Sequence, residues 1–176
     1  MVADISKKEE VQRITSEVAS KEHHGIQLLV NNAGIAKDEE TRYETNGQPR
    51  LNDAQAISEF FMKSNPHSWA DTFQTNVTAQ FFMSMAFLPL LACGCDIVPG
   101  YTSSIVQISS NSGFLKGNTR GYIAYSASKA GATSQLTFQL MSAEFSCPLL
   151  TCNRIHSYHP SCPNVGNDIF ADESAC

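Results

Sequence analysis

The stretch that decides the fold is IQLLVNNAG, residues 26–34. Residues 26–30 are a short, mostly apolar run, and the polar turn of residues 31–34 follows at once. A run of this kind between turn signals indicates a strand that is covered on both faces, as in a parallel sheet. Ligands of such sheets bind beyond the carboxyl ends of the strands, so the turn marks one edge of a candidate site.

The segment before this stretch has the pattern of a helix. Val11, Ile14 and Val18 recur at helical spacing. Ser6 with Glu9 three residues later forms a capping box, which predicts a helix over residues 6–21.

The segment after the stretch begins with a polar region and continues into a long helix. Residues 35–65 predict a loop with one short helix over residues 53–63. Proline is favoured at the first helical position, so the pair Asn65-Pro66 predicts a helix start. Gly94 is the expected end of that helix.

A second strand and a further helix complete the pattern. Residues 104–109 repeat the apolar strand signal, and residues 122–145 predict a helix. Helices and strands therefore alternate, which indicates an α/β fold with a parallel sheet. We expect this domain to occupy residues 1–150 and residues 151–176 to form a disordered tail.

The composition is that of a globular protein. Of 176 residues, 42% are hydrophobic and 16% are charged, which is too apolar for a disordered chain. The net charge of −5 argues against nucleic acid and against an anionic membrane as the main partner. The most apolar stretch, residues 81–93, is too short to span a bilayer and is expected to be a buried helix.

The cysteines and the first residues indicate a compartment. The chain starts without an apolar signal segment, and none of its six cysteines forms a CxxC pair. We therefore expect free thiols in a reducing environment and a cytoplasmic location.

Tyr125 and Lys129 lie four residues apart, so one helix face presents both side chains. A phenol is a poor base at neutral pH. An ammonium about 4 Å away would favour the phenolate by roughly 4 kcal/mol at an effective dielectric constant of about 20. The pair can therefore form an acid/base centre that works near neutral pH. The spacing alone would also fit a pair that only packs together. Tyr122 is not a candidate for the same role, because it has no lysine four residues further on.

Two further polar residues are expected in the crevice between the strand ends and the start of the last predicted helix. Ser110 follows the second predicted strand, where its hydroxyl can donate to a substrate carbonyl as charge develops. Asn76 lies inside the long predicted helix, although asparagine is a poor helix former. An amide at that point can bend the helix and hold a water molecule.

Together these motifs resemble those of the short-chain dehydrogenase/reductase family. The matching segments are the NNAG motif at residues 31–34, the mid-helix Asn76, the strand-end Ser110 and the YxxxK motif at residues 125–129. They come in the family's order and at nearly its spacing. The resemblance implies a Rossmann-like, doubly wound parallel sheet and an NAD(P)-dependent oxidoreductase that acts on a small carbonyl or alcohol substrate.

The resemblance also implies catalytic roles. Tyr125 is the general acid/base on the substrate oxygen. Lys129 makes that phenol more acidic and bonds the nicotinamide ribose. Ser110 orients and polarises the carbonyl, and Asn76 supports a proton relay through water.

The cofactor contacts follow from the same resemblance. Besides the Tyr125 and Lys129 pair, Asp4 matches an aspartate that contacts adenine. Asn31, Ala33 and Gly34 match residues that line the adenosine side. In the family the long helices commonly form a dimer interface, so a homo-oligomer is expected of the full-length protein.

The sequence departs from the family at both ends. It contains no GxxxGxG or GxGxxG motif, so we expect the first two strand–helix units, which bind the pyrophosphate, to be absent. That part also distinguishes NAD from NADP; either is expected, with NADP slightly preferred. Residues 151–176 do not align. No metal is expected, although Cys152, His156, His159 and Cys162 are possible soft ligands.

Two hypotheses remain open. The first is an oxidoreductase that transfers hydride between nicotinamide and a carbonyl or secondary alcohol. The second is a truncated, non-catalytic fragment that has lost cofactor binding and at most pairs with other chains. Ser110, Tyr125 and Lys129 favour the first hypothesis, and the missing glycine-rich turn favours the second.

Overall fold

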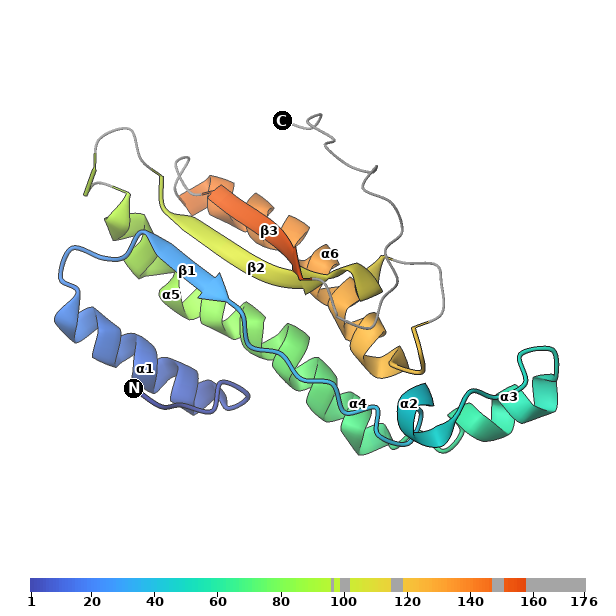
Figure 1. Cartoon of the computed structure of the whole chain (residues 1–176). Helices are drawn as coiled ribbons and strands as arrows, with labels where there is room; N and C mark the ends of the chain where they lie inside the picture. The colour runs from blue at the N-terminus through green and yellow to red at the C-terminus, as the bar shows by residue number, and fades with distance from the viewer. Residues whose placement is uncertain (96, 99–101, 115–118, 147–150, 158–176) are drawn as a thin grey trace, which may run out of the picture.

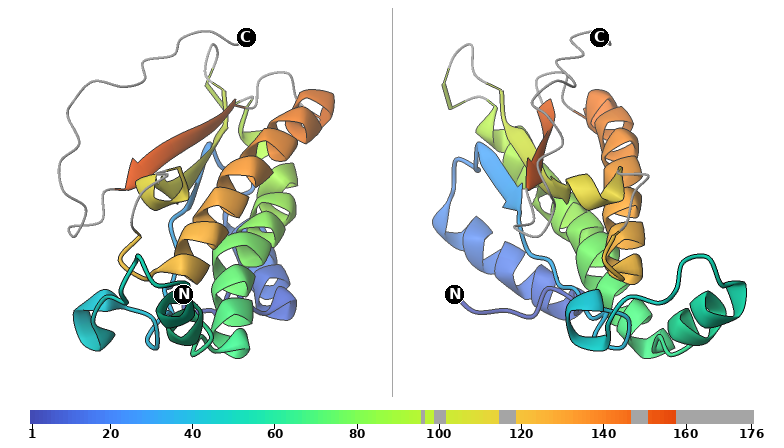
Figure 2. Two further views of the ribbon diagram at one scale, coloured as in Figure 1. Left: turned by 90° about the vertical axis from the view of Figure 1, so that its right-hand side faces the viewer. Right: turned by 45° about the vertical axis from the view of Figure 1, so that its right-hand side comes forward.

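The computed structural model describes the backbone of residues 1–95, 97–98, 102–114, 119–146 and 151–157, and side chains as far as residue 135. This part of the chain forms a parallel sheet with long helices packed on one of its faces (Figures 1 and 2).

The sheet has three strands in the order β1-β2-β3. They are β1 (Leu28–Asn31), β2 (Ser104–Ser110) and β3 (Thr151–Ser157). Both pairings are parallel, with Leu29 opposite Ile105 and Ile105 opposite Cys152. The parallel sheet expected from the alternating pattern is confirmed.

The long helices lie on one side of this sheet, as the left view of Figure 2 shows. They are α1 (Lys8–Lys21), α4 (Pro66–Phe73), α5 (Gln80–Gly94) and α6 (Ile123–Ser146). A single π-helical turn, Gln74–Ala79, joins α4 to α5 in one continuous helix. Polar residues Asn76, Gln80 and Ser84 are buried along it.

Two short helices extend beyond the carboxyl ends of the strands (Figure 1). They are α2 (Tyr43–Asn46), which has no clear pattern in the sequence, and α3 (Ala54–Phe61), which confirms the expected short helix. Asp53 caps α3 by accepting from Ala56 N at 3.1 Å.

The apolar core lies between α1, α5 and the first two strands. Its buried members are Ile14, Leu29, Phe87, Leu91 and Ile105. Each fully buried side chain of this size contributes about 1.5–3 kcal/mol to folding. This cluster holds the sheet against the helices at the end away from the carboxyl ends of the strands.

The other face of β1 is open in the part of the chain that the structure describes. Leu28 is 56% exposed and Val30 48% exposed, while Leu29 and Asn31 between them are buried. β1 is also an edge strand of the described sheet. The expectation that this strand is covered on both faces is therefore wrong for these residues: all the long helices pack on one face.

The start of α1 differs from the expected capping box. The flanking residue is Lys7, and no side chain caps the helix there. Residues 4–7 instead form a turn in which Asp4 Oδ1 accepts from Ser6 N and, at 2.7 Å, from the Ser6 hydroxyl, and Asp4 O accepts from Lys7 N. This turn places Ser6 one residue before the capping position. The helix nevertheless ends at Lys21 as predicted.

The start of the long helix is as predicted: Pro66 is the first residue of α4, and Asn65 Oδ1 accepts from His67 N at 2.8 Å. The continuous helix Pro66–Gly94 has 29 residues and a mean hydropathy of 1.6 in its most apolar window, so by length and composition it could cross a bilayer. Its apolar part is thus longer than residues 81–93. Core helices of α/β domains pass the same test, and this helix packs on the sheet through buried residues.

The disordered tail expected from residue 151 onward is wrong for residues 151–157. Residues 151–157 form β3, which pairs with β2 along its whole length. The sequence of these residues is mostly polar and lacks the apolar run that marks a buried strand. The strand is instead ordered by its backbone pairing with β2. Residues 158–176 lie outside the described part of the chain.

The open edge of β1 predicts self-association. A strand edge without a neighbour can pair with another chain, and the exposed Leu28 and Val30 of β1 add apolar surface to that edge. We expect Leu28→Lys to raise the fraction of monomer, because a charge on the edge strand opposes pairing. Size-exclusion chromatography with light scattering measures the change. Leu51→Lys is the matched control, because Leu51 is 57% exposed but lies away from the sheet; an equal effect of both substitutions would contradict the edge as the cause.

Candidate active site

The Tyr125 and Lys129 pair lies near the start of α6, facing the end of β2. Lys129 is only 3% exposed, and its Nζ donates to the carbonyl of Ile108 at 2.8 Å. The same ammonium lies 5.9 Å from the centre of the Tyr125 ring. Burial lowers the pKa of Lys129. The strand thus holds the lysine in place beside the half-buried tyrosine.

Asn76 connects the π-helical turn to the loop after β1. Its Oδ1 accepts from Ile35 N, and its Nδ2 donates to Ile35 O, both at 2.8 Å. Nδ2 also donates to Ser128 Oγ at 2.9 Å. A π-helical turn contains one extra residue, and such turns occur frequently at functional sites. Asn76 therefore fixes the loop against α6, and its amide groups are engaged by protein atoms.

Gly34 brings the NNAG turn next to Lys129. A Cβ atom at this glycine would lie 3.4 Å from Asn76 Oδ1 and 3.5 Å from Lys129 Nζ. The loop is exposed at Ala33 and Gly34. The turn at the carboxyl end of β1 therefore lies directly beside the buried lysine.

Ser110 ends β2 and is fully buried. Its Oγ accepts from Ser112 N at 3.2 Å and lies 3.4 Å from Asn111 Oδ1. The loop that follows packs tightly on α6, since a Cβ at Gly113 would lie 2.8 Å from the carbonyl carbon of Lys129. β2 therefore delivers Ser110 to the part of α6 that carries the lysine.

The Asn31 side chain points into the interior. Its Nδ2 donates to Ser84 Oγ at 2.8 Å and to Gln107 Oε1 at 3.3 Å. The nearby carbonyl of Ala33 accepts from Gln80 Nε2 at 2.8 Å. Any contact of Asn31 with a cofactor would therefore have to come from its backbone.

Asp4 lies apart from this group, at the start of α1. It is exposed, and its carboxylate accepts from Ser6 N and Ser6 Oγ. The Ser6 hydrogen bonds lower the pKa of Asp4, with a smaller contribution from Lys7. The adenine contact expected of Asp4 stays a prediction.

Sequence reasoning missed a second layer of residues around α6. Asp38 is 2% exposed and accepts from Ala124 N and Tyr125 N. The Thr41 hydroxyl donates to Gly121 O at 2.8 Å. No local pattern marks these residues, because their partners lie about 80 residues further along the chain.

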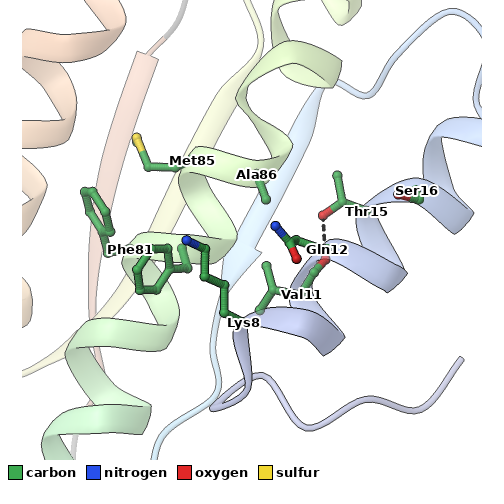
Figure 3. A pocket seen from close by; sticks show the side chains of 9 residues that line it. Lys8, Val11, Gln12, Thr15, Ser16, Phe81, Met85 and Ala86 are labelled. Atoms are coloured by element: carbon green, nitrogen blue, oxygen red, sulfur yellow. Dashed lines mark hydrogen bonds between the residues drawn. The ribbon is translucent and has the colours of Figure 1, made fainter.

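A groove lies away from this site. It runs between α1 and α5, with Lys8 and Gln12 from one helix and Met85 and Ala86 from the other among its lining residues (Figure 3). None of its lining residues is a candidate site residue.

Among the described side chains no group of three or more His, Cys, Asp or Glu could hold a metal. The possible ligands at residues 152–162 lie outside the described side chains.

Comparison with known proteins identifies the family. The family model described as short chain dehydrogenase matches residues 1–146. The chain belongs to the short-chain dehydrogenase family. Two fungal relatives are similar: short-chain dehydrogenase/reductase PhomF of Diaporthe leptostromiformis is 34% identical over 143 residues, and VdtF of Byssochlamys spectabilis is 28% identical over 145. The alignments cover 80% and 72% of this chain but 45% and 46% of the relatives, so the chain spans about half their length.

Solved structures of short-chain dehydrogenases share the fold. An NADPH-bound carbonyl reductase from chicken fatty liver superposes with a TM-score of 0.63 at 22% identity, covering 88% of this chain and 55% of that one. NADH-dependent reductase A1-R′, complexed with NAD, gives 0.67 at 20% identity, covering 92% and 57%. The Rossmann fold expected from the resemblance is thus confirmed, in incomplete form.

The turn before α6 gives a stability prediction. Gly121 has a φ of +86°, and a Cβ there would collide with the carbonyl of Thr41. Gly47 has a φ of +72° with nothing within 4 Å of its Cβ position. We expect Gly47→Ala to cost about 1–3 kcal/mol through the backbone alone, because its φ of +72° and ψ of 166° lie in a region that is essentially restricted to glycine. Gly121→Ala should cost roughly 2 kcal/mol more through the added clash. Urea unfolding measures both; equal costs would show that the turn can relax away from Thr41.

Proposed function

We propose that this short-chain dehydrogenase is an NAD(P)-dependent oxidoreductase that interconverts a carbonyl and a secondary alcohol. The observation that carries the proposal is that three segments of the chain meet at Lys129. Lys129 is buried between the end of β2 and the NNAG turn, with Gly34 on one side and Tyr125 on the other. Together these residues supply an acid/base group, a cation and open backbone at the carboxyl edge of a parallel sheet.

The residues fit the nicotinamide end of the cofactor. Gly34 leaves space beside Lys129 that a side chain would fill, and a lysine ammonium can donate to ribose hydroxyl groups. When bound, the cofactor supplies or accepts the hydride. The glycine-rich turn that binds the pyrophosphate in such sheets does not occur in the sequence. None of the described residues distinguishes NAD from NADP. We propose either cofactor, with NADP slightly preferred.

The chain's own residues handle the proton. In the reduction, the Tyr125 hydroxyl donates its proton to the substrate oxygen as negative charge develops there. Lys129 stabilises the phenolate that remains, because its positive charge is buried nearby and fixed by Ile108 O. Ser110 would donate to the same substrate oxygen and orient it once its buried hydroxyl turns from Asn111 Oδ1 toward the substrate. Asn76 acts by holding the loop and α6 in register, since its amide is bonded to Ile35 and Ser128.

The remaining parts of the proposal concern the setting of the reaction. We propose a small-molecule substrate, a cytoplasmic location and a homo-oligomer of the full-length protein, with neither nucleic acid nor membrane as partner. The carbonyl reductases among the solved relatives support a carbonyl substrate.

Cofactor titration tests the proposal. The calorimetric assay uses the protein at its full natural length, because the chain spans about half of its relatives. We expect NADH or NADPH to bind, and Lys129→Ala to weaken that binding at least about tenfold through loss of the ribose contact. Lys37→Ala is the control, since Lys37 lies on the loop after β1, close in sequence to the NNAG turn, but pairs with Asp71. Absence of binding of either cofactor to the full-length protein would contradict the proposed function. The same titration of the 176-residue chain decides whether that chain by itself is a non-catalytic fragment.

Turnover tests the role of Tyr125. Tyr125→Phe removes the proton donor but keeps the ring, so we expect carbonyl reduction to fall below about 1% of the parent, within the loss expected when acid/base catalysis is removed, while cofactor affinity stays the same. Tyr122→Phe is the matched control, because Tyr122 lies one turn away and has no lysine four residues on. Residual activity of Tyr125→Phe well above this level would exclude the acid/base role.

A further inference from the structure

The first turn of α6 depends on a side chain from elsewhere in the chain. The first N–H groups of a helix have no partner within the helix and are usually satisfied by a Ser, Thr, Asp or Asn just before it. The residue before α6 is Tyr122, which is not of this kind. Tyr125 is the third residue of the helix, so its own N–H is one of these groups.

Asp38 takes the place of the missing capping residue. Its Oδ1 accepts from Ala124 N at 2.8 Å, and its Oδ2 accepts from Tyr125 N at 3.2 Å. These are the second and third helical residues, the positions that a local cap normally serves. The negative charge also faces the positive end of the helix dipole. Both oxygens of one carboxylate thus hold the backbone at the proposed acid/base residue.

The loop that carries Asp38 is itself fixed at both ends. Before it, Asn76 holds the N–H and the carbonyl of Ile35. After it, Thr41 donates to Gly121 O, and Tyr43 N donates to Arg120 O at 3.0 Å. Asp38 therefore cannot follow a displaced helix, and the position of the first turn of α6 depends on the loop.

From this geometry we infer that Asp38 is a positioning residue for the proposed reaction: it sets the backbone of Tyr125 so that the phenol lies beside Lys129. The inference rests on the proposed function. Lys129 is held separately by Ile108 O, so loss of Asp38 would move the tyrosine relative to a fixed ammonium. Catalytic rate would fall while the ribose contact of Lys129 remains.

Burial and hydrogen bonding act in opposite directions on the carboxyl group of Asp38. Burial raises the pKa of Asp38, while the N–H groups of Ala124 and Tyr125 oppose that change. A neutral amide at this position would keep one acceptor oxygen and turn its NH₂ group toward the other N–H. Asp38→Asn should therefore cap the helix only in part.

Hydrogen exchange in the 176-residue chain tests the cap without any activity. Residue-resolved mass spectrometry follows the amides of Ala124 and Tyr125. We expect exchange to be about tenfold faster in Asp38→Ala, as for loss of a helix cap, and intermediate in Asp38→Asn. Glu39→Ala is the matched control: it removes the same charge from the next residue, which is exposed and pairs with Arg42 instead. Exchange in Asp38→Ala no faster than in this control overturns the inference.

Kinetics of the full-length protein test the positioning role. We expect kcat of Asp38→Ala to fall between about tenfold and a hundredfold, the range for a misplaced catalytic group, with cofactor affinity within about twofold of the parent. Asp38→Asn should recover part of the rate, and it decides the matter if Asp38→Ala does not fold. Faster exchange with an unchanged kcat would show a cap without a positioning role and overturns the inference. A parent that binds no cofactor and turns over no carbonyl sinks the proposed function itself, which no failure of Asp38 alone would do.

Discussion

The side-chain amide of Asn76 joins the three parts of the structure that make the site. It lies on the π-helical turn, bonds both backbone groups of Ile35 in the loop after β1, and donates to Ser128 on α6. A buried amide that loses its partners costs about 1–3 kcal/mol for each unsatisfied group. The loop, the long helix and α6 are therefore constrained together, and displacing one of them breaks hydrogen bonds in the other two.

The interior between the sheet and the long helix is divided along its length. At one end it is apolar, with residues such as Leu29, Phe87 and Leu91. Toward the carboxyl ends of the strands it becomes polar, where Gln107 bonds to Gln80 and Asn31 to Ser84. Apolar packing is tolerant of small changes, whereas buried hydrogen bonds have fixed geometry. Cohesion comes mainly from the first end, and the backbone of the NNAG turn is fixed by the second.

The features that sequence predicted well were local ones. The Asn65-Pro66 start depends on neighbouring residues, and the YxxxK spacing depends only on helix geometry. Features set by distant partners were missed. Asp38 bonds to residues 86 and 87 positions away, and β3 acquires its order from pairing with β2. The predicted cap at Ser6 is absent because residues 4–7 form a turn, which moves the start of the helix past Ser6.

The π-helical turn also determines where the length of this chain can vary. Each residue of a regular α-helix turns the following part by about 100°, so a deletion within α4 or α5 would rotate one part of the helix by that angle relative to the other. The wider turn at Gln74–Ala79 accommodates one extra residue while the α-helical parts on either side stay in phase. Loss of one residue from this turn would restore a regular helix and keep Trp69 and Phe73 aligned with the buried Gln80 and Ser84. A single-codon deletion in the turn is therefore absorbed locally, whereas the same deletion in α4 or α5 would misalign a whole helix face.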